Sequence, residues 1–90
     1  MPSYLVETYL SRTSAADRIA CEQRARSAAE ELTRERKRVR FERSIHIPED
    51  ETCFFVFQAA TSGDAALVAE RARLNPIRIV EVVSSGPEAA

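Results

Sequence analysis

Hydrophobic and polar residues along this chain follow a period typical of strands in four segments. Aromatic and β-branched residues dominate residues 4–10, and residues 37–47 alternate between apolar and polar positions. Residues 52–58 are apolar at both parities, as is expected of a central strand. Residues 77–83 are a fourth apolar run. We therefore expect four strands.

Two further segments have the composition and spacing of helices. Residues 14–35 are rich in Ala, Glu and Arg and contain neither Gly nor Pro. At 3.6 residues per turn, one side of this helix collects small apolar side chains that should pack on the sheet: Cys21, Ala25, Ala28, Ala29 and Leu32. Residues 61–64 have the form of a capping box, so a shorter helix is expected over residues 65–73, before Pro76.

The expected order of elements is strand, helix, strand, strand, helix, strand. This order is the signature of a ferredoxin-like α+β sandwich, in which two helices cover one face of a four-stranded antiparallel sheet. Right-handed crossovers would place the first and third strands in the middle of the sheet. We expect a single domain over residues 4–83, followed by a flexible C-terminal tail over residues 84–90.

The second face of such a sheet has no helix to cover it, and here that face is partly apolar. In residues 52–58, Phe54 and Val56 alternate with Cys53, Phe55 and Phe57, so both sides of the strand carry apolar groups. Monomers rarely leave a sheet-sized apolar patch in water. We therefore expect a homodimer, in which two open sheet faces stack or join across a two-fold axis.

The composition and charge of the chain argue against several classes of binding partner. The 90 residues are 44% hydrophobic and 30% charged, which fits one small domain. The net charge of -1 provides no basic field for nucleic acid, and no apolar run approaches the ~20 residues that span a bilayer. Two cysteines are too few for a disulfide framework, and no export signal opens the chain. We expect a cytoplasmic protein that binds neither nucleic acid nor membrane.

Four residues are candidates for binding a small ligand on the sheet: Glu7, Tyr9, Arg43 and Glu81. Glu7 and Glu81 interrupt apolar runs on strands that we expect to be neighbours, and a carboxylate inside a sheet costs free energy unless it is paired. The two carboxylates could line a polar pocket with Tyr9 and Arg43. The alternatives are structural ion pairs with arginines of the second strand, or simple exposure of the two carboxylates at the rim of a dimer.

His46 is the only histidine of the chain. Together with Glu42, which shares its parity on the second strand, it is a candidate metal ligand or general base, and a surface histidine is the alternative. The segment Arg34–Arg40 is a concentrated basic run that could bind an anion or complement the dipole of a helix C-terminus. No phosphate-binding loop, GxSxG or HExxH motif is present, so enzymatic activity stays open.

Several segments resemble those of a known family: Tyr4–Glu7, Val39–Ser44, Ile47–Phe54, Arg71–Leu74 and Ile79–Glu81. On these residues the chain resembles the DUF4242-type family of small bacterial ferredoxin-like proteins, which includes a nickel-binding protein. The resemblance covers residues 4–83 and implies a dimeric α/β domain with a divalent metal, such as nickel, held by His and acidic side chains. Tyr9 and Leu74 stand where that protein has histidines, and tyrosine is a poor nickel ligand and leucine none.

Three functions are compatible with these residues. The first is a non-catalytic homodimer that binds a small ligand or a metal on the polar part of the sheet face. The second is a small enzyme of the dimeric α/β-barrel type, a cofactor-free oxygenase or isomerase, with His46 or Glu7 as its base. The third is a structural or partner-binding module that uses its sheet face and the Arg34–Arg40 run.

Overall fold

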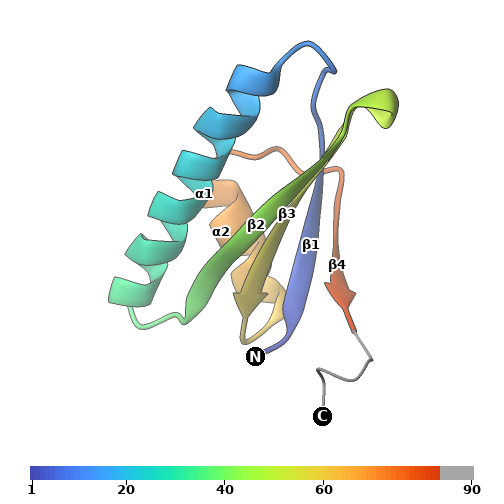
Figure 1. Ribbon diagram of the computed structural model, residues 1–90. Coiled ribbons are helices and arrows are strands. Elements are labelled where there is room, and N and C mark those ends of the chain that lie inside the picture. Colours follow the sequence, from blue (N-terminus) through green and yellow to red (C-terminus); the bar gives the residue numbers. More distant parts are fainter. Residues whose placement is uncertain (84–90) are drawn as a thin grey trace.

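The computed structural model describes residues 1–83, which form one sheet with two α-helices on the same side of it (Figure 1). In chain order the elements are β1 (Ser3–Tyr9), α1 (Ala15–Arg34), β2 (Val39–Ile47), the short 3-10 helix η1 (Pro48–Asp50), β3 (Thr52–Ala59), α2 (Ser62–Arg71) and β4 (Arg78–Val82). The tail expected at residues 84–90 lies outside the described residues. Neither α-helix in residues 1–83 is long and apolar enough to cross a membrane.

The strands of the sheet are arranged in the order β2-β3-β1-β4, and each neighbouring pair is antiparallel. This arrangement confirms the expected ferredoxin-like α+β fold, with β1 and β3 in the middle. Val6 of β1 lies between Phe55 of β3 and Ile79 of β4, so these three side chains share the face that the helices cover. β2 and β4 form the two edges of the sheet.

The core lies between the helices and one face of the sheet. α1 contributes small side chains to it, since Ala25, Ala28 and Ala29 are buried and Cys21 packs against them from a partly exposed position. Small side chains let a helix approach a sheet closely but bury little apolar area each. Most of the volume comes from the strands, and the rings of Phe41 and Phe57 lie 5.4 Å apart, centroid to centroid.

Two arginines connect α1 to α2 at the surface. Arg24 Nε donates a hydrogen bond to the carbonyl of Ala72 at 2.9 Å, which satisfies a carbonyl at the end of α2. The guanidinium of Arg71 lies 2.5 Å from the carboxylate of Glu35 and 3.5 Å from that of Glu31. The hydrogen bond from Arg71 lowers the pKa of the Glu35 carboxyl. Both connections join helices that are far apart in the sequence.

A β-bulge interrupts the pairing of β2 with β3. Phe41 pairs with Phe57, but the next regular partner, Arg43, pairs with Val56, so Glu42 is an extra residue on β2. Because side chains of a strand alternate between faces, one extra residue reverses the direction of every side chain that follows it.

The bulge corrects the expectation that residues 37–47 alternate regularly, which would place Val39, Phe41, Ile45 and Ile47 together on one apolar face. Val39 and Phe41 do face the helices, and both are buried. Beyond the bulge, Ile45 and Ile47 pair with residues on the open side of β3 and are more than a third exposed. The expectation was wrong because an unbroken alternation in the sequence hides the inserted residue.

The N-cap of α2 offers a stability test. The hydroxyl of Thr61 accepts a hydrogen bond from the backbone N–H of Asp64 at 3.1 Å, as the capping box predicts, whereas Ser14 caps α1 without a side-chain bond. We expect Thr61→Ala to lower the free energy of unfolding by about 1 kcal/mol, and Ser14→Ala to lower it much less. Urea unfolding of both variants checks this, and equal losses would contradict it.

Candidate functional site

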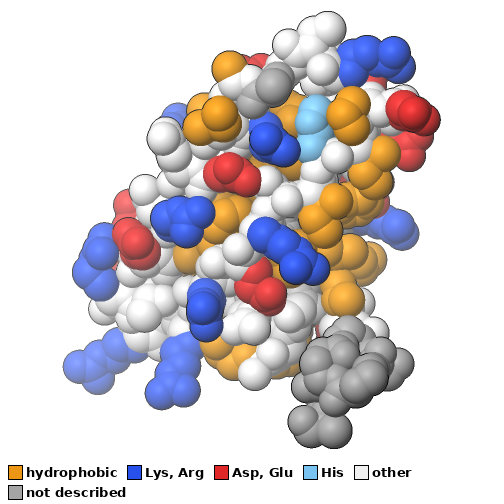
Figure 2. Space-filling view, in the orientation of Figure 1, with side chains coloured by type: hydrophobic (Ala, Val, Ile, Leu, Met, Phe, Trp, Pro, Cys, Tyr) orange, Lys and Arg blue, Asp and Glu red, His pale blue; other side chains and the backbone are white. Residues whose placement is uncertain are grey.

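The sheet face turned away from the helices, called the open face here, is apolar at its centre. Its apolar side chains come from all four strands: Leu5, Ile45, Ile47, Phe54, Val56, Val80 and Val82. Val56 is only 6% exposed, whereas Ile45 and Ile47 are 39% and 38% exposed. Hydrophobic side chains are visible along the flank of the molecule away from α1 (Figure 2). The face expected to be uncovered and apolar is therefore present.

A hollow of about 320 Å³ lies on the open face, and the bulge supplies its two charged side chains. Its lining residues are Ser3, Leu5, Glu42, Arg43, Ile45, Val56 and Val82. Glu42 reaches across β3 and accepts a hydrogen bond from the hydroxyl of Ser3 at 3.1 Å. Among the described residues, none forms an ion pair with Arg43. The hollow thus combines apolar walls with a free guanidinium.

The structure does not bring the four candidate ligand-binding residues together. Glu7 lies on the open face and accepts a hydrogen bond from Arg78 Nε at 2.7 Å, so it belongs to an ion pair with β4 rather than with β2. Glu81 pairs with Tyr4 and therefore lies on the opposite face from Glu7. Tyr9 is 63% exposed at the end of β1. Only Arg43 lines the hollow of the open face.

The bulge also separates the candidate metal ligands. His46 pairs with Cys53 on the side of the helices, whereas Glu42 lies on the open face, so the expectation that they share a face was wrong. Within residues 1–83, no three side chains of His, Cys, Asp or Glu are grouped so that they could hold a metal ion. Residues 1–83 of one copy therefore do not form the metal site that the family resemblance implies.

His46 belongs instead to a polar group between α1 and the sheet. The hydroxyl of Ser44, two residues before it, donates a hydrogen bond to Glu22 of α1. His46 Nε2 is buried and has no hydrogen-bond partner among the described residues. On β3, Cys53 is fully buried, and burial raises the pKa of its thiol to about 11. A thiol with so high a pKa is not a nucleophile near neutral pH.

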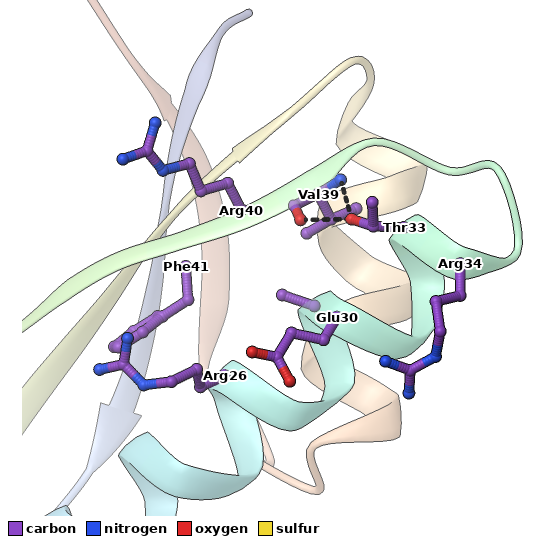
Figure 3. Close-up of a pocket in the computed structure, with 8 residues that line it drawn as sticks. Arg26, Glu30, Thr33, Arg34, Val39, Arg40 and Phe41 are labelled. Carbon is purple, nitrogen blue, oxygen red and sulfur yellow. Dashed lines mark hydrogen bonds between the residues drawn. The ribbon is translucent and has the colours of Figure 1, made fainter.

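A second hollow, which we call the α1–β2 groove, lies between the C-terminal half of α1 and the start of β2 (Figure 3). Its volume is about 430 Å³, and its lining residues are Arg26, Ala29, Glu30, Thr33, Arg34, Val39, Arg40 and Phe41. The guanidinium of Arg26 lies over the ring of Phe41 at 5.2 Å. Thr33 connects α1 to the start of β2 at this groove, because its hydroxyl donates a hydrogen bond to the carbonyl of Val39 at 2.9 Å.

Sequence reasoning found only part of the α1–β2 groove. Arg34 and Arg40 belong to the basic run that the sequence marks, but Figure 3 shows both side chains directed away from the space between helix and strand. The side chains directed into that space are those of Arg26, Glu30 and Phe41. The available signal was the spacing of Arg26 and Glu30, which lie four residues apart and so on one side of a helix.

Comparison with known proteins supports the fold. The chain is similar to the protein SCO4226 from Streptomyces coelicolor A3(2), known from a crystal structure, with a TM-score of 0.76 and 16% sequence identity. The similarity covers 93% of this chain and 99% of that one. No family model matches the chain, and no curated protein matches it. At this identity the likeness concerns the fold alone, and the resemblance to the DUF4242-type family stays a prediction.

The buried thiol of Cys53 should make stability depend on pH in the alkaline range. Its pKa is about 11 when folded and 9.0 when unfolded, so the thiol stabilises the fold fully below pH 9 and loses that contribution as the pH rises toward 11. The loss should reach at most about 2 to 3 kcal/mol. Urea unfolding at several pH values should show a steeper decline for the parent than for Cys53→Ala, and parallel declines would contradict the assignment.

Proposed function

We propose that this chain is a non-catalytic homodimeric protein that binds a small ligand, and that it uses the open face for both tasks. The observation that carries the proposal is the open face itself, where an apolar surface surrounds a hollow with the free guanidinium of Arg43. A large contiguous apolar surface that is exposed on a protein commonly marks an interaction site. The proposed partner at this surface is a second copy of the chain.

Charge supports a second copy as the partner. In a two-fold interface the same surface meets itself, so it must be compatible with its own charges. Side chains of both signs lie around the apolar centre of the open face, with Glu7 and Glu42 as acids and Arg40, Arg43 and Arg78 as bases. A face with both signs can oppose its own copy without net repulsion, whereas a face of one sign could not.

The ligand would then lie in the hollow between two stacked sheets. A second copy would cover the hollow and exclude water from it, which strengthens any interaction with Arg43. A guanidinium with free donors favours a carboxylate or phosphate group. We infer a small organic anion as the ligand, and we place the protein in the cytoplasm, because both of its cysteines are free thiols.

No observation favours the enzyme alternative. An acid-base enzyme of the dimeric barrel type would need Glu7 or His46 beside an enclosed apolar pocket that admits a substrate. Glu7 is paired with Arg78, and neither Glu7 nor His46 lines the two hollows described above. Between the sheet and the helices, the space is filled by fully buried side chains such as Phe55, Phe57 and Leu32.

A charge on the open face should prevent dimerisation. We expect Ile45→Glu to be monomeric by multi-angle light scattering at micromolar concentration, since it places a carboxylate in the proposed apolar contact. Ile19→Glu is the matched control, because Ile19 is 54% exposed on α1, away from that contact. The control should stay dimeric like the parent. A monomeric parent would overturn the dimer.

Ligand binding is tested separately by thermal unfolding in a panel of small organic anions, with divalent metal ions as a second panel. A ligand that binds only the folded state raises the melting temperature. We expect at least one organic anion to raise it, and the shift should disappear in Arg43→Gln but persist in Arg12→Gln, an exposed control. If no compound of either panel raises the melting temperature of the parent, the proposed binding function is wrong, even if the protein is a dimer.

A further inference from the structure

The α1–β2 groove contains two opposite charges that do not neutralise each other. Arg26 and Glu30 lie four residues apart on α1, a spacing at which such pairs commonly meet. Within residues 1–83, however, neither side chain takes part in an ion pair. The guanidinium of Arg26 lies instead over the ring of Phe41, at 5.2 Å from its centroid. Figure 3 shows the carboxylate of Glu30 directed into the same groove from the next turn of the helix.

An apolar surface lies beside these two charges. It is formed by Ala29, Val39 and Phe41, which are buried in the core, so that only narrow parts of their side chains face the groove. The hydroxyl of Thr33 is occupied by its bond to Val39, so it offers no donor to a ligand. The groove therefore presents one cation, one anion and an apolar floor, in a volume of about 430 Å³ that is within the usual range for small-molecule sites.

We propose that the α1–β2 groove binds a free α-amino acid with an apolar side chain. Such a molecule carries a carboxylate and an ammonium group on one carbon atom, which matches a cation and an anion on one side of a helix. The carboxylate would bind the guanidinium fork of Arg26, and the ammonium group would bind Glu30. The apolar side chain would lie over the narrow parts of Val39 and Phe41 that face the groove.

This site is independent of the open face and of the proposed dimer. The groove is built by α1 and the first residues of β2, on the side of the sheet that carries the helices, whereas the proposed dimer contact is on the other side. A monomeric variant such as Ile45→Glu should therefore bind the amino acid as well as the parent does. If the protein proves to be a monomer, the proposed amino-acid site is unaffected. If no amino acid binds, the proposed dimer is unaffected.

The test is a titration of the ¹⁵N-labelled full chain with L-leucine and with L-phenylalanine, each up to millimolar concentration. Two-dimensional ¹H–¹⁵N NMR spectra record the amide signals at each step. We expect saturable shifts of the amide signals of Ala29, Thr33 and Phe41. N-acetyl-L-leucine lacks the ammonium charge and L-leucinamide lacks the carboxylate. Each should bind about 10-fold more weakly or worse, the loss typical of one removed charged hydrogen bond.

Variants separate a binding role from a structural one. Arg26→Gln and Glu30→Gln should each weaken binding about 10-fold or more. Arg38→Gln and Glu49→Gln remove the same charges at exposed positions outside the groove, and they should bind like the parent. Shifts away from the groove, no saturable shifts, or equal binding of N-acetyl-L-leucine and L-leucine would each overturn the proposal.

Discussion

The bulge at Glu42 sets the direction of every side chain in the second half of β2, and both faces of the sheet depend on it. On the helix side it places Ser44 where its hydroxyl reaches Glu22 of α1. On the open side it places Glu42 and Arg43 at the same hollow, where a regular strand would present only one of them. The polar character of the open face is thus a result of backbone geometry as much as of composition.

The elements and their order could be predicted because they depend on local patterns. The alanine-rich side of α1, the continuous apolar run of β3 and the Thr61 cap are each visible in a short stretch of sequence. The bulge could not be predicted, because the apolar residues on either side of it fit an unbroken strand equally well. The candidate metal pair of His46 and Glu42 depended on that unbroken strand. The fold could therefore be predicted from the sequence, whereas the arrangement of this candidate site could not.

The α1–β2 groove follows from the small side chains that α1 uses against the sheet. Ala29 leaves space above Val39 and Phe41 that a leucine at this position would fill. The same choice moves most of the core volume to the phenylalanines of the strands, so one ring can serve the core on one side and carry the Arg26 guanidinium on the other. These two contacts of Phe41 join residues from different elements, so the sequence of α1 alone does not reveal them.

The position of the bulge on an edge strand has one more consequence. β2 is nine residues long, and an exposed edge of that length is a template onto which further chains could add without limit, as they do in fibrils. The irregular backbone at Glu42, together with charged side chains on either side of it, interrupts the row of donors and acceptors that such growth requires. Addition of further strands at this edge is thereby discouraged.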